Sequence, residues 1–404
     1  MSSQKIIFSQ IVSLIPWYQF DKIVLTYKGD HKIQNFKCRD HLLVMLFAQL
    51  TYREGLRSIE SSLNSQRAKL YHMGIRCNKI ARNTLANANE IRDYRIYEEL
   101  AAVLATRAKE LYAEDKILED LEFDKSIYAL DSSAINICLS FAPWARYKEN
   151  KGAGEIKLHS LIDLKGNIPS FNVVTDGKVY DGAILDILPF EAGSIYIMDR
   201  GYLDYKRLYN VEKNKSFFIS RATSNIKLKR IISNKKPTNK TANPDEEIEI
   251  IICDQIVSFA TRKARKSYPQ KLRKIRYKFK EKGTKEFKSL IFITNNFSLE
   301  ALTIARLYKK RWQIELFFKW IKQHLKIKTF YSYNENGVKV QIWTAICAYL
   351  LVAILKKEFK IDQSLYTILQ VLSINIFERT QINQLFTDFN HKNYKDDTYQ
   401  PLLL

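Results

Sequence analysis

Cysteine is scarce in this chain of 404 residues, and other absences narrow its class further. The five cysteines are an odd number with scattered spacing, so we expect no disulfide framework and a reducing compartment. No secretory leader is predicted, because serine and glutamine interrupt the apolar part of MSSQKIIFSQIVSLIPW and no small-residue cleavage site follows. Low-complexity tracts and internal repeats are also missing. We therefore expect a cytoplasmic protein.

Long apolar runs are missing as well. The longest near-apolar run, Ile342 to Leu355, is too short to span a bilayer and predicts a buried core helix. We expect no membrane association.

Negative charge is under-represented. The chain has 43 Asp and Glu residues against 65 Lys and Arg residues, which gives a net charge of +22. Such an excess favours a polyanionic partner, and nucleic acid fits better than an anionic membrane. Hydrophobic residues make up 46% of the chain, so it is folded, and its length allows two or three domains.

The stretch from Thr303 to Lys326 contains no Gly or Pro and predicts one helix. At about 100° per residue, four side chains fall within about 40° of the direction of Glu315: Tyr308, Arg311, Lys319 and Lys322. One carboxylate among cations and a phenol suits a metal ligand whose neighbours hold phosphates. A solvated face with i,i+4 ion pairs is the plainer alternative.

Strands are predicted from about Phe123 onward. The predicted strands are 127–137, 156–164, 168–174, 194–198 and 216–220, and helices are predicted at 179–190 and 202–213. Lys165-Gly166-Asn167 predicts a hairpin turn. This order indicates an α/β fold whose mixed, RNase H-like sheet forms a catalytic core.

Two aspartates accompany the central strands of that sheet. Asp131 lies on the first strand and Asp199 ends the fourth, while the later helix can bring Glu315 to them. Three packed carboxylates repel one another unless cations neutralise them. Oxygen ligands without His or Cys favour Mg²⁺ or Mn²⁺, and two such ions can cleave a phosphodiester.

The region from 1 to 118 is predicted to be a helical domain that binds DNA ends, with a plain helical adaptor as the alternative. Cys38, His41, His72 and Cys77 resemble a zinc set only loosely, since their spacing fits no common finger. The catalytic domain is predicted at 119–330 and a C-terminal helical region at 331–404.

A basic, β-rich insertion is predicted at about 222–289, between Asp199 and Glu315. Leu272 to Lys280 alternates apolar and basic residues, which is typical of a half-buried strand. We expect its basic face, including Arg276 and Lys278, to lie along a DNA backbone, with a solvated loop as the alternative.

Two motifs resemble those of the insertion-sequence-4-type DDE transposases of bacteria. Asp199-Arg200-Gly201-Tyr202 has the Asp-x-Gly-aromatic form. The second, more specific motif is Y-x2-R-x3-E-x6-K, formed by Tyr308, Arg311, Glu315 and Lys322. The resemblance extends over nearly the whole chain, including RNTLANANEIRDYRIYEEL, which is similar to a helical domain attached to one branch of the family.

The resemblance implies a metal-dependent DNA transposase, associated with the nucleoid. Such an enzyme binds terminal inverted repeats of double-stranded DNA, cleaves the transposon ends and joins the 3′ ends to target DNA, as a homodimer when the ends are paired. It implies that Asp131, Asp199 and Glu315 are catalytic and hold two Mg²⁺ or Mn²⁺ ions. Phosphate contacts would come from Tyr308, Arg311, Lys319 and Lys322. An RNase H-like nuclease without strand transfer, and a catalytically silent DNA-binding regulator, are the alternatives.

The tryptophans depart from the family pattern. Relatives that cut through a hairpin stack a flipped base on a tryptophan in the insertion, but all five tryptophans of this chain lie elsewhere. Phe287 is the substitute that we expect; its alternative role is in the core of the insertion.

Overall fold

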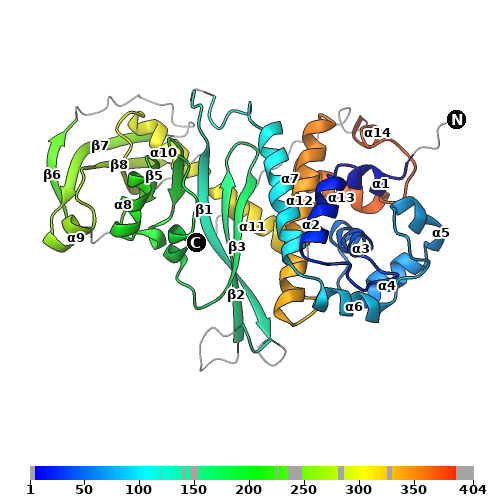
Figure 1. Cartoon of the computed structure of the whole chain (residues 1–404). Coiled ribbons are helices and arrows are strands. Elements are labelled where there is room, and N and C mark those ends of the chain that lie inside the picture. Colours follow the sequence, from blue (N-terminus) through cyan, green and yellow to red (C-terminus); the bar gives the residue numbers. More distant parts are fainter. Residues whose placement is uncertain are drawn as a thin grey trace. The chain divides into compact units, whose positions relative to one another are not determined.

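The chain folds into two compact units in the computed structural model (Figure 1). It describes residues 5–119, 121–138, 142–145, 153–223, 226–234, 248–280, 286–324 and 330–387. Unit 1 consists of Met1–Leu104, Thr329–Ser332 and Asn336–Leu404, and unit 2 of Ala105–Lys328 and Tyr333–Glu335. The two ends of the chain therefore share one helical unit, and the sheet belongs to the other.

Unit 1 is built around two apolar helices. Its helices, in chain order, are α1 (Ile7–Val12), α2 (Trp17–Thr26), α3 (Cys38–Leu50), α4 (Leu56–Asn64), α5 (Arg67–Leu70), η1 (Tyr71–Met73), α6 (Arg82–Ile91), the first part of α7 (Arg95–Leu111), α12 (Glu335–Glu358), α13 (Leu365–Asn375) and α14 (Gln384–Thr387). Nearly every residue of α3 and of the middle of α12 is buried, so these two form its centre.

The prediction of a buried core helix at Ile342 to Leu355 is confirmed. Helix α12 is long and apolar enough to cross a membrane by length and composition, but 94% of its apolar window is buried inside the protein. Its apolar surface is therefore already covered by protein, as in any core helix.

The loose zinc set does not assemble around His41. Its Nδ1 lies 2.6 Å from the Tyr97 hydroxyl and its Nε2 lies 2.9 Å from Asn89 Oδ1. Burial lowers the pKa of His41 to about 3, so the ring is neutral and serves the hydrogen bonds of the core.

Unit 2 contains one nine-stranded sheet with the order β3-β2-β1-β4-β5-β9-β8-β7-β6. The strands are β1 (Ile127–Cys138), β2 (Ala153–Asp163), β3 (Ile168–Asp176), β4 (Ile195–Met198), β5 (Phe217–Arg221), β6 (Leu228–Ser233), β7 (Ile248–Phe259), β8 (Leu272–Lys280) and β9 (Lys288–Thr294). Strands β1, β2 and β3 are antiparallel neighbours, whereas β1, β4 and β5 run parallel. This is the RNase H-like arrangement, and the predicted fold class is confirmed.

The insertion strands extend the same sheet. Strand β9, which was not among the predicted strands, pairs with β5 on one side and with β8 on the other. Strands β8, β7 and β6 then follow as an antiparallel meander. The basic strands are thereby fixed to the same sheet that carries the aspartates.

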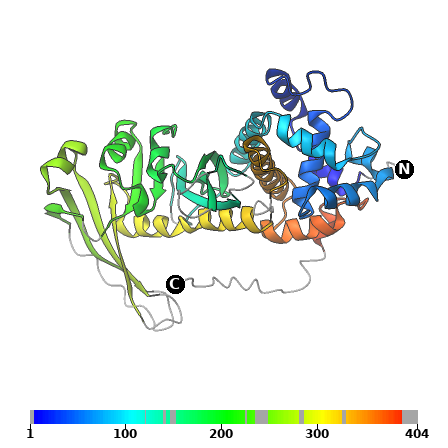
Figure 2. The same ribbon diagram turned by 90° about the horizontal axis from the view of Figure 1, so that it is seen from below.

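Helices cover both faces of the sheet (Figure 2). One face packs against α8 (Tyr205–Lys213) and α9 (Arg262–Ser267), in a core that includes Tyr128, Leu130, Tyr196 and Met198. The other face carries α10 (Ala301–Lys310), which contacts β5, β7 and β8, and α11 (Trp312–His324), which contacts β1 and β2.

Two helix predictions need correction. The predicted single helix from Thr303 to Lys326 is divided between α10 and α11 at Arg311, whose backbone stays in the right-handed helical region at φ −52° and ψ −30°. The helix axis therefore continues almost unbroken, and Lys326 lies outside the described residues.

The predicted helix at 179–190 is only a 3₁₀ segment, η2 (Asp181–Asp186). Gly182 weakens an α-helix at this place, and Pro189 would end it.

The helix predicted at 202–213 begins later than expected. Residues Arg200–Tyr202 form a 3₁₀ turn, η3, and α8 begins at Tyr205, with Asp204 as its N-cap.

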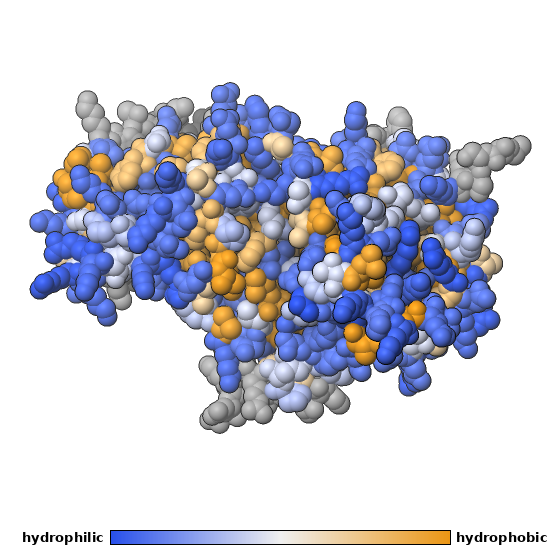
Figure 3. Space-filling model, viewed as in Figure 1, coloured by the Kyte–Doolittle hydropathy of each residue, from blue (hydrophilic) through white to orange (hydrophobic). Residues whose placement is uncertain are grey.

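On the face of the molecule shown in Figure 3, hydrophilic residues predominate, as expected for a chain with 27% charged residues.

Candidate active site

The two aspartates leave the sheet side by side on one face. Strands β1 and β4 pair in parallel with Leu130 opposite Met198; Asp131 is the next residue on β1, and Asp199 is the first residue after the end of β4. Side chains alternate along a strand, and Leu130 and Met198 point into the core beneath α8. Asp131 and Asp199 therefore face the side on which α11 lies.

Glu315 joins Asp131 through the guanidinium group of Arg311. Arg311 Nη1 donates to Asp131 Oδ2 at 2.8 Å, and its Nη2 donates to Glu315 Oε1 at 2.6 Å. Arg311 and Glu315 are one turn apart, so the α10–α11 junction presents both to β1. The structure thus brings together two of the three predicted carboxylates around one cation.

The pKa of Asp131 is raised by its surroundings. Burial raises the pKa of Asp131 to about 6, and the charges of Asp199 and Glu315 add to that rise. The Arg311 guanidinium and the backbone amide of Ser132 act in the opposite direction. All three carboxylates therefore belong to one electrostatic site.

The residues present fit a divalent cation by their chemistry. The donors are carboxylate oxygens, which Mg²⁺ and Mn²⁺ prefer, and one guanidinium cannot balance three carboxylates. Among the residues that the structure describes, no three His, Cys, Asp or Glu side chains lie close enough together to hold one ion. Arg311 occupies the space between Asp131 and Glu315 instead.

A network that sequence reasoning missed holds the Asp199 turn. Asp199 Oδ1 accepts from the Gly201 amide at 2.7 Å, and the carbonyl of Gly201 accepts from the Tyr180 hydroxyl at 2.7 Å. The Ser220 hydroxyl donates to the carbonyl of Asp199 at 3.1 Å. The Asp-x-Gly pattern is thus a turn in which the carboxylate caps its own 3₁₀ segment.

Lys157 and His159 flank this network on β2. Lys157 Nζ contacts Asp181 at 3.1 Å and the carbonyl of Val179 at 3.0 Å. His159 is fully buried, and burial lowers its pKa to about 4. Lys157 fastens the segment that carries Tyr180 to the sheet, whereas His159 Nε2 hydrogen-bonds the Thr175 hydroxyl on β3 at 3.0 Å.

The predicted phosphate-contacting residues are in different environments. Tyr308 is largely buried against Phe292, with its ring 5.9 Å from the Arg311 guanidinium carbon. Lys319 is exposed on α11, and Lys322 donates to the carbonyl of Ala134 on β1. Only Lys319 is therefore fully open to solvent among these cations and the tyrosine.

The basic strand β8 presents alternate residues to opposite faces. Arg276 is exposed, Lys278 is partly exposed, and Tyr277 between them is buried. Lys278 Nζ lies 4.4 Å from the ring centroid of Phe287, which is 43% exposed. Phe287 is therefore not part of the buried core, whereas Tyr277 and Phe279 are.

Arg273, at the start of β8, is structural. It is buried, forms an ion pair with Asp254 at 2.8 Å and donates to the carbonyl of Leu299.

Glu249 on β7 was not predicted from the sequence as a residue with a role. It accepts from the Tyr277 hydroxyl and from Arg306 of α10, which ties the insertion to the helix pair.

Comparison with known proteins agrees with this geometry. Residues 122–351 match the model of the transposase DDE domain, and residues 3–76 match a domain of unknown function. A protein of Sinorhizobium fredii named as transposase y4zB is 34% identical over 239 residues, which are 59% of this chain and 64% of that protein. The match thus spans slightly less than two thirds of that relative.

Two further matches are with another curated relative and with a solved structure. A protein of Synechocystis sp. named as a transposase for insertion sequence element IS4SA is 27% identical over 83% of this chain and 88% of its own. A solved piggyBac transposase synaptic complex with hairpin DNA covers 96% of this chain and 80% of its own, with 12% identity and a TM-score of 0.42. The family match covers more than half of the residues, and the chain belongs to the transposases with a DDE domain.

Proposed function

We propose that this protein binds the terminal inverted repeats of its own element, cleaves the ends and joins the 3′ ends to target DNA. The observation that carries the proposal is that Asp131 follows Leu130 on β1 and Asp199 follows Met198 at the end of β4, where these strands pair in parallel, and that Arg311 bridges Asp131 and Glu315. Family membership supports a DNA-cleaving enzyme, and the net charge of +22 supports a DNA substrate.

Asp131, Asp199 and Glu315 are the residues that would hold two Mg²⁺ or Mn²⁺ ions. When bound, the ions supply activation of a water or 3′-hydroxyl and charge stabilisation at the phosphodiester. Arg311, which bridges Asp131 and Glu315, would face a DNA phosphate once these carboxylates hold cations. Tyr308, Lys319 and Lys322 lie on the same helices and position the DNA end.

The remaining assignments rest on charge and exposure. Arg276 and Lys278 hold the DNA backbone along β8, and the half-exposed Phe287 provides the stacking surface for a flipped base. Residues 1–118 read the inverted repeat. The protein acts in the cytoplasm at the nucleoid, as a homodimer when both ends are paired.

The test uses labelled duplexes that carry the inverted repeat flanking the gene. We expect Asp131→Asn, Asp199→Asn and Glu315→Gln each to abolish Mg²⁺-dependent cleavage while end binding stays within about threefold, because binding comes from cationic surface. In the same assay, Phe287→Ala should lower hairpin product at least tenfold on pre-nicked ends and leave first-strand nicking intact.

Two outcomes would contradict the proposal. Retained cleavage in any carboxylate variant would remove that residue from the site. Cleavage without joining of the 3′ ends to a target plasmid would identify a nuclease instead of a transposase.

A further inference from the structure

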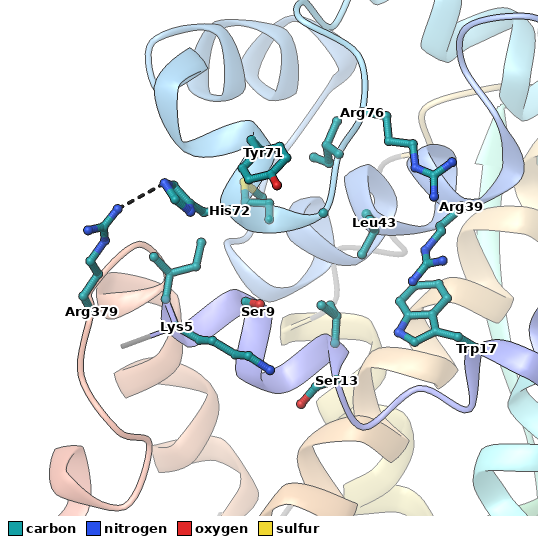
Figure 4. A pocket seen from close by; sticks show the side chains of 15 residues that line it. Lys5, Ser9, Ser13, Trp17, Arg39, Leu43, Tyr71, His72, Arg76 and Arg379 are labelled. Atoms are coloured by element: carbon teal, nitrogen blue, oxygen red, sulfur yellow. Dashed lines mark hydrogen bonds between the residues drawn. The ribbon is translucent and has the colours of Figure 1, made fainter. Parts of the chain in front are cut away.

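Unit 1 contains a cavity of about 500 Å³ that belongs to neither the carboxylates nor the sheet (Figure 4). Separate segments form it: α1 and the residues beside it, Trp17 at the start of α2, the first turn of α3, and the 3₁₀ turn at Tyr71–Met73. Gly74, at φ +83°, turns the chain back so that Arg76 also reaches the cavity. The loop after α13 completes the wall with Arg379.

Cations dominate the polar side of this cavity. Lys5, Arg39, Arg76 and Arg379 line it, and no aspartate or glutamate is among its lining residues in the described part of the chain. Arg379 Nη2 donates to His72 Nε2 at 3.1 Å, so its partner at the cavity is an imidazole and not a carboxylate. Four like charges converging on one cavity favour an anionic ligand.

The other walls are aromatic and apolar. The Arg39 guanidinium stacks on Trp17 at 4.0 Å from the ring centroid, which fixes its orientation. Tyr71 is 83% exposed, and the buried side chains of Leu43 and Met73 lie behind it. Apolar surface beside cations suits a ligand that has sugar or base carbons next to its phosphates, and not a bare inorganic anion.

We propose that this cavity binds the sugar–phosphate backbone of duplex DNA, with Arg39, Arg76 and Arg379 on successive phosphates and Tyr71 against a sugar. The inference rests on the proposed function, because the substrate of the carboxylate site is taken to be DNA. It gives a role to the matched domain of unknown function, whose residues supply all of the cavity wall except Arg379. It also gives the C-terminal region a part in DNA binding.

The test compares two triple variants of the full chain. The first is Arg39→Gln/Arg76→Gln/Arg379→Gln, and the matched control, Arg57→Gln/Arg67→Gln/Arg82→Gln, removes three exposed arginines of the same unit that lie outside the cavity. Binding of the labelled inverted-repeat duplex is followed by fluorescence anisotropy over a salt series. We expect the cavity variant to bind at least tenfold more weakly, with a log–log salt slope lower by about two to three, whereas the control changes less than threefold.

A single variant keeps the proposal testable if the triple variant does not fold. Tyr71→Ala removes an exposed ring, and we expect it to weaken duplex binding about threefold to tenfold without changing thermal unfolding. Equal losses in the cavity and control triples, or unchanged binding in the cavity triple and Tyr71→Ala, would overturn the cavity assignment alone. Competition by free ATP at the cavity without loss of duplex binding would also overturn it. Failure of the unaltered protein to bind any duplex would overturn the proposed function as well.

Discussion

At the scale of single residues, the observed contacts of Arg311 exclude the phosphate contact that we propose for it. Its guanidinium bridges Asp131 and Glu315, and burial opposes its charge while Tyr308 and the carboxylates raise its pKa. The same group stands in the family motif where a phosphate contact is implied. The bridge is therefore the arrangement that a divalent cation would replace, since both neutralise the same oxygens.

This argument predicts opposite effects of Arg311→Met with and without metal. In metal-free buffer we expect a loss of about 1–3 kcal/mol of stability, because charge-assisted hydrogen bonds vanish and carboxylates are left facing one another. Added Mg²⁺ should then raise the Tm of the variant more than that of the unaltered chain. Lys319→Met, on the exposed side of α11, is the control and should change neither value.

Differential scanning fluorimetry with a Mg²⁺ titration makes the measurement. An unchanged metal-free Tm for Arg311→Met would show that the bridge contributes no stability.

At the scale of elements, the β2–β3 hairpin positions the helix that carries Glu315. Gly166 has φ +74° and Asn167 has φ +56°, so the last two residues of the turn between Asp163 and Ile168 are both left-handed. Asn167 Nδ2 donates to Gln313 Oε1 at 3.2 Å, two residues before Glu315. The turn predicted at Lys165-Gly166-Asn167 therefore does two things. It reverses the chain between β2 and β3, and it contacts α11, the helix that carries Glu315.

Gly166→Ala tests this coupling. A side chain is strained at this φ, and its Cβ would lie 2.2 Å from the Tyr112 ring, so we expect a loss of at least about 1 kcal/mol. Gly55→Ala is the control, because Gly55 is extended at φ −169° and nothing lies within 4 Å of an added Cβ. Thermal unfolding and end cleavage are both measured. A Gly166→Ala chain with the stability of the control would show that the turn relaxes without cost.

At the scale of the whole molecule, a net charge of +22 does not say which cations meet DNA. Arg273 is buried on Asp254, whereas Arg276 three residues later is exposed on the same strand. A charge count over the insertion treats these two arginines alike. Burial and pairing divide them into one structural cation and one that is available to a phosphate.

We therefore expect Arg276→Gln/Lys278→Gln to lower the log–log salt slope of duplex binding by about two, with little change in stability. Arg273→Gln should instead leave the buried carboxylate of Asp254 unpaired and destabilise the chain by about 3–5 kcal/mol. Anisotropy titrations at several salt concentrations and denaturant unfolding separate the two effects. A salt slope that falls equally in both variants would contradict this division.

The sequence by itself determined the fold class and the first five strands, and it predicted three candidate carboxylates whose role remains a proposal. These predictions depend on local patterns, which can be recognised in the sequence alone. The patterns are the strand periodicity, the turn at Lys165-Gly166-Asn167 and the spacing from Tyr308 to Lys322. The tertiary structure alone decided the rest, because it depends on pairings between distant segments. These are the strand β9 that joins the insertion to the sheet, the burial of Arg273, the bridge of Arg311 to Asp131, and the convergence of Arg39, Arg76 and Arg379 on one cavity. Each of these contacts joins residues that are far apart in the sequence. No local sequence pattern predicts such a contact, so it is seen only in the packed structure.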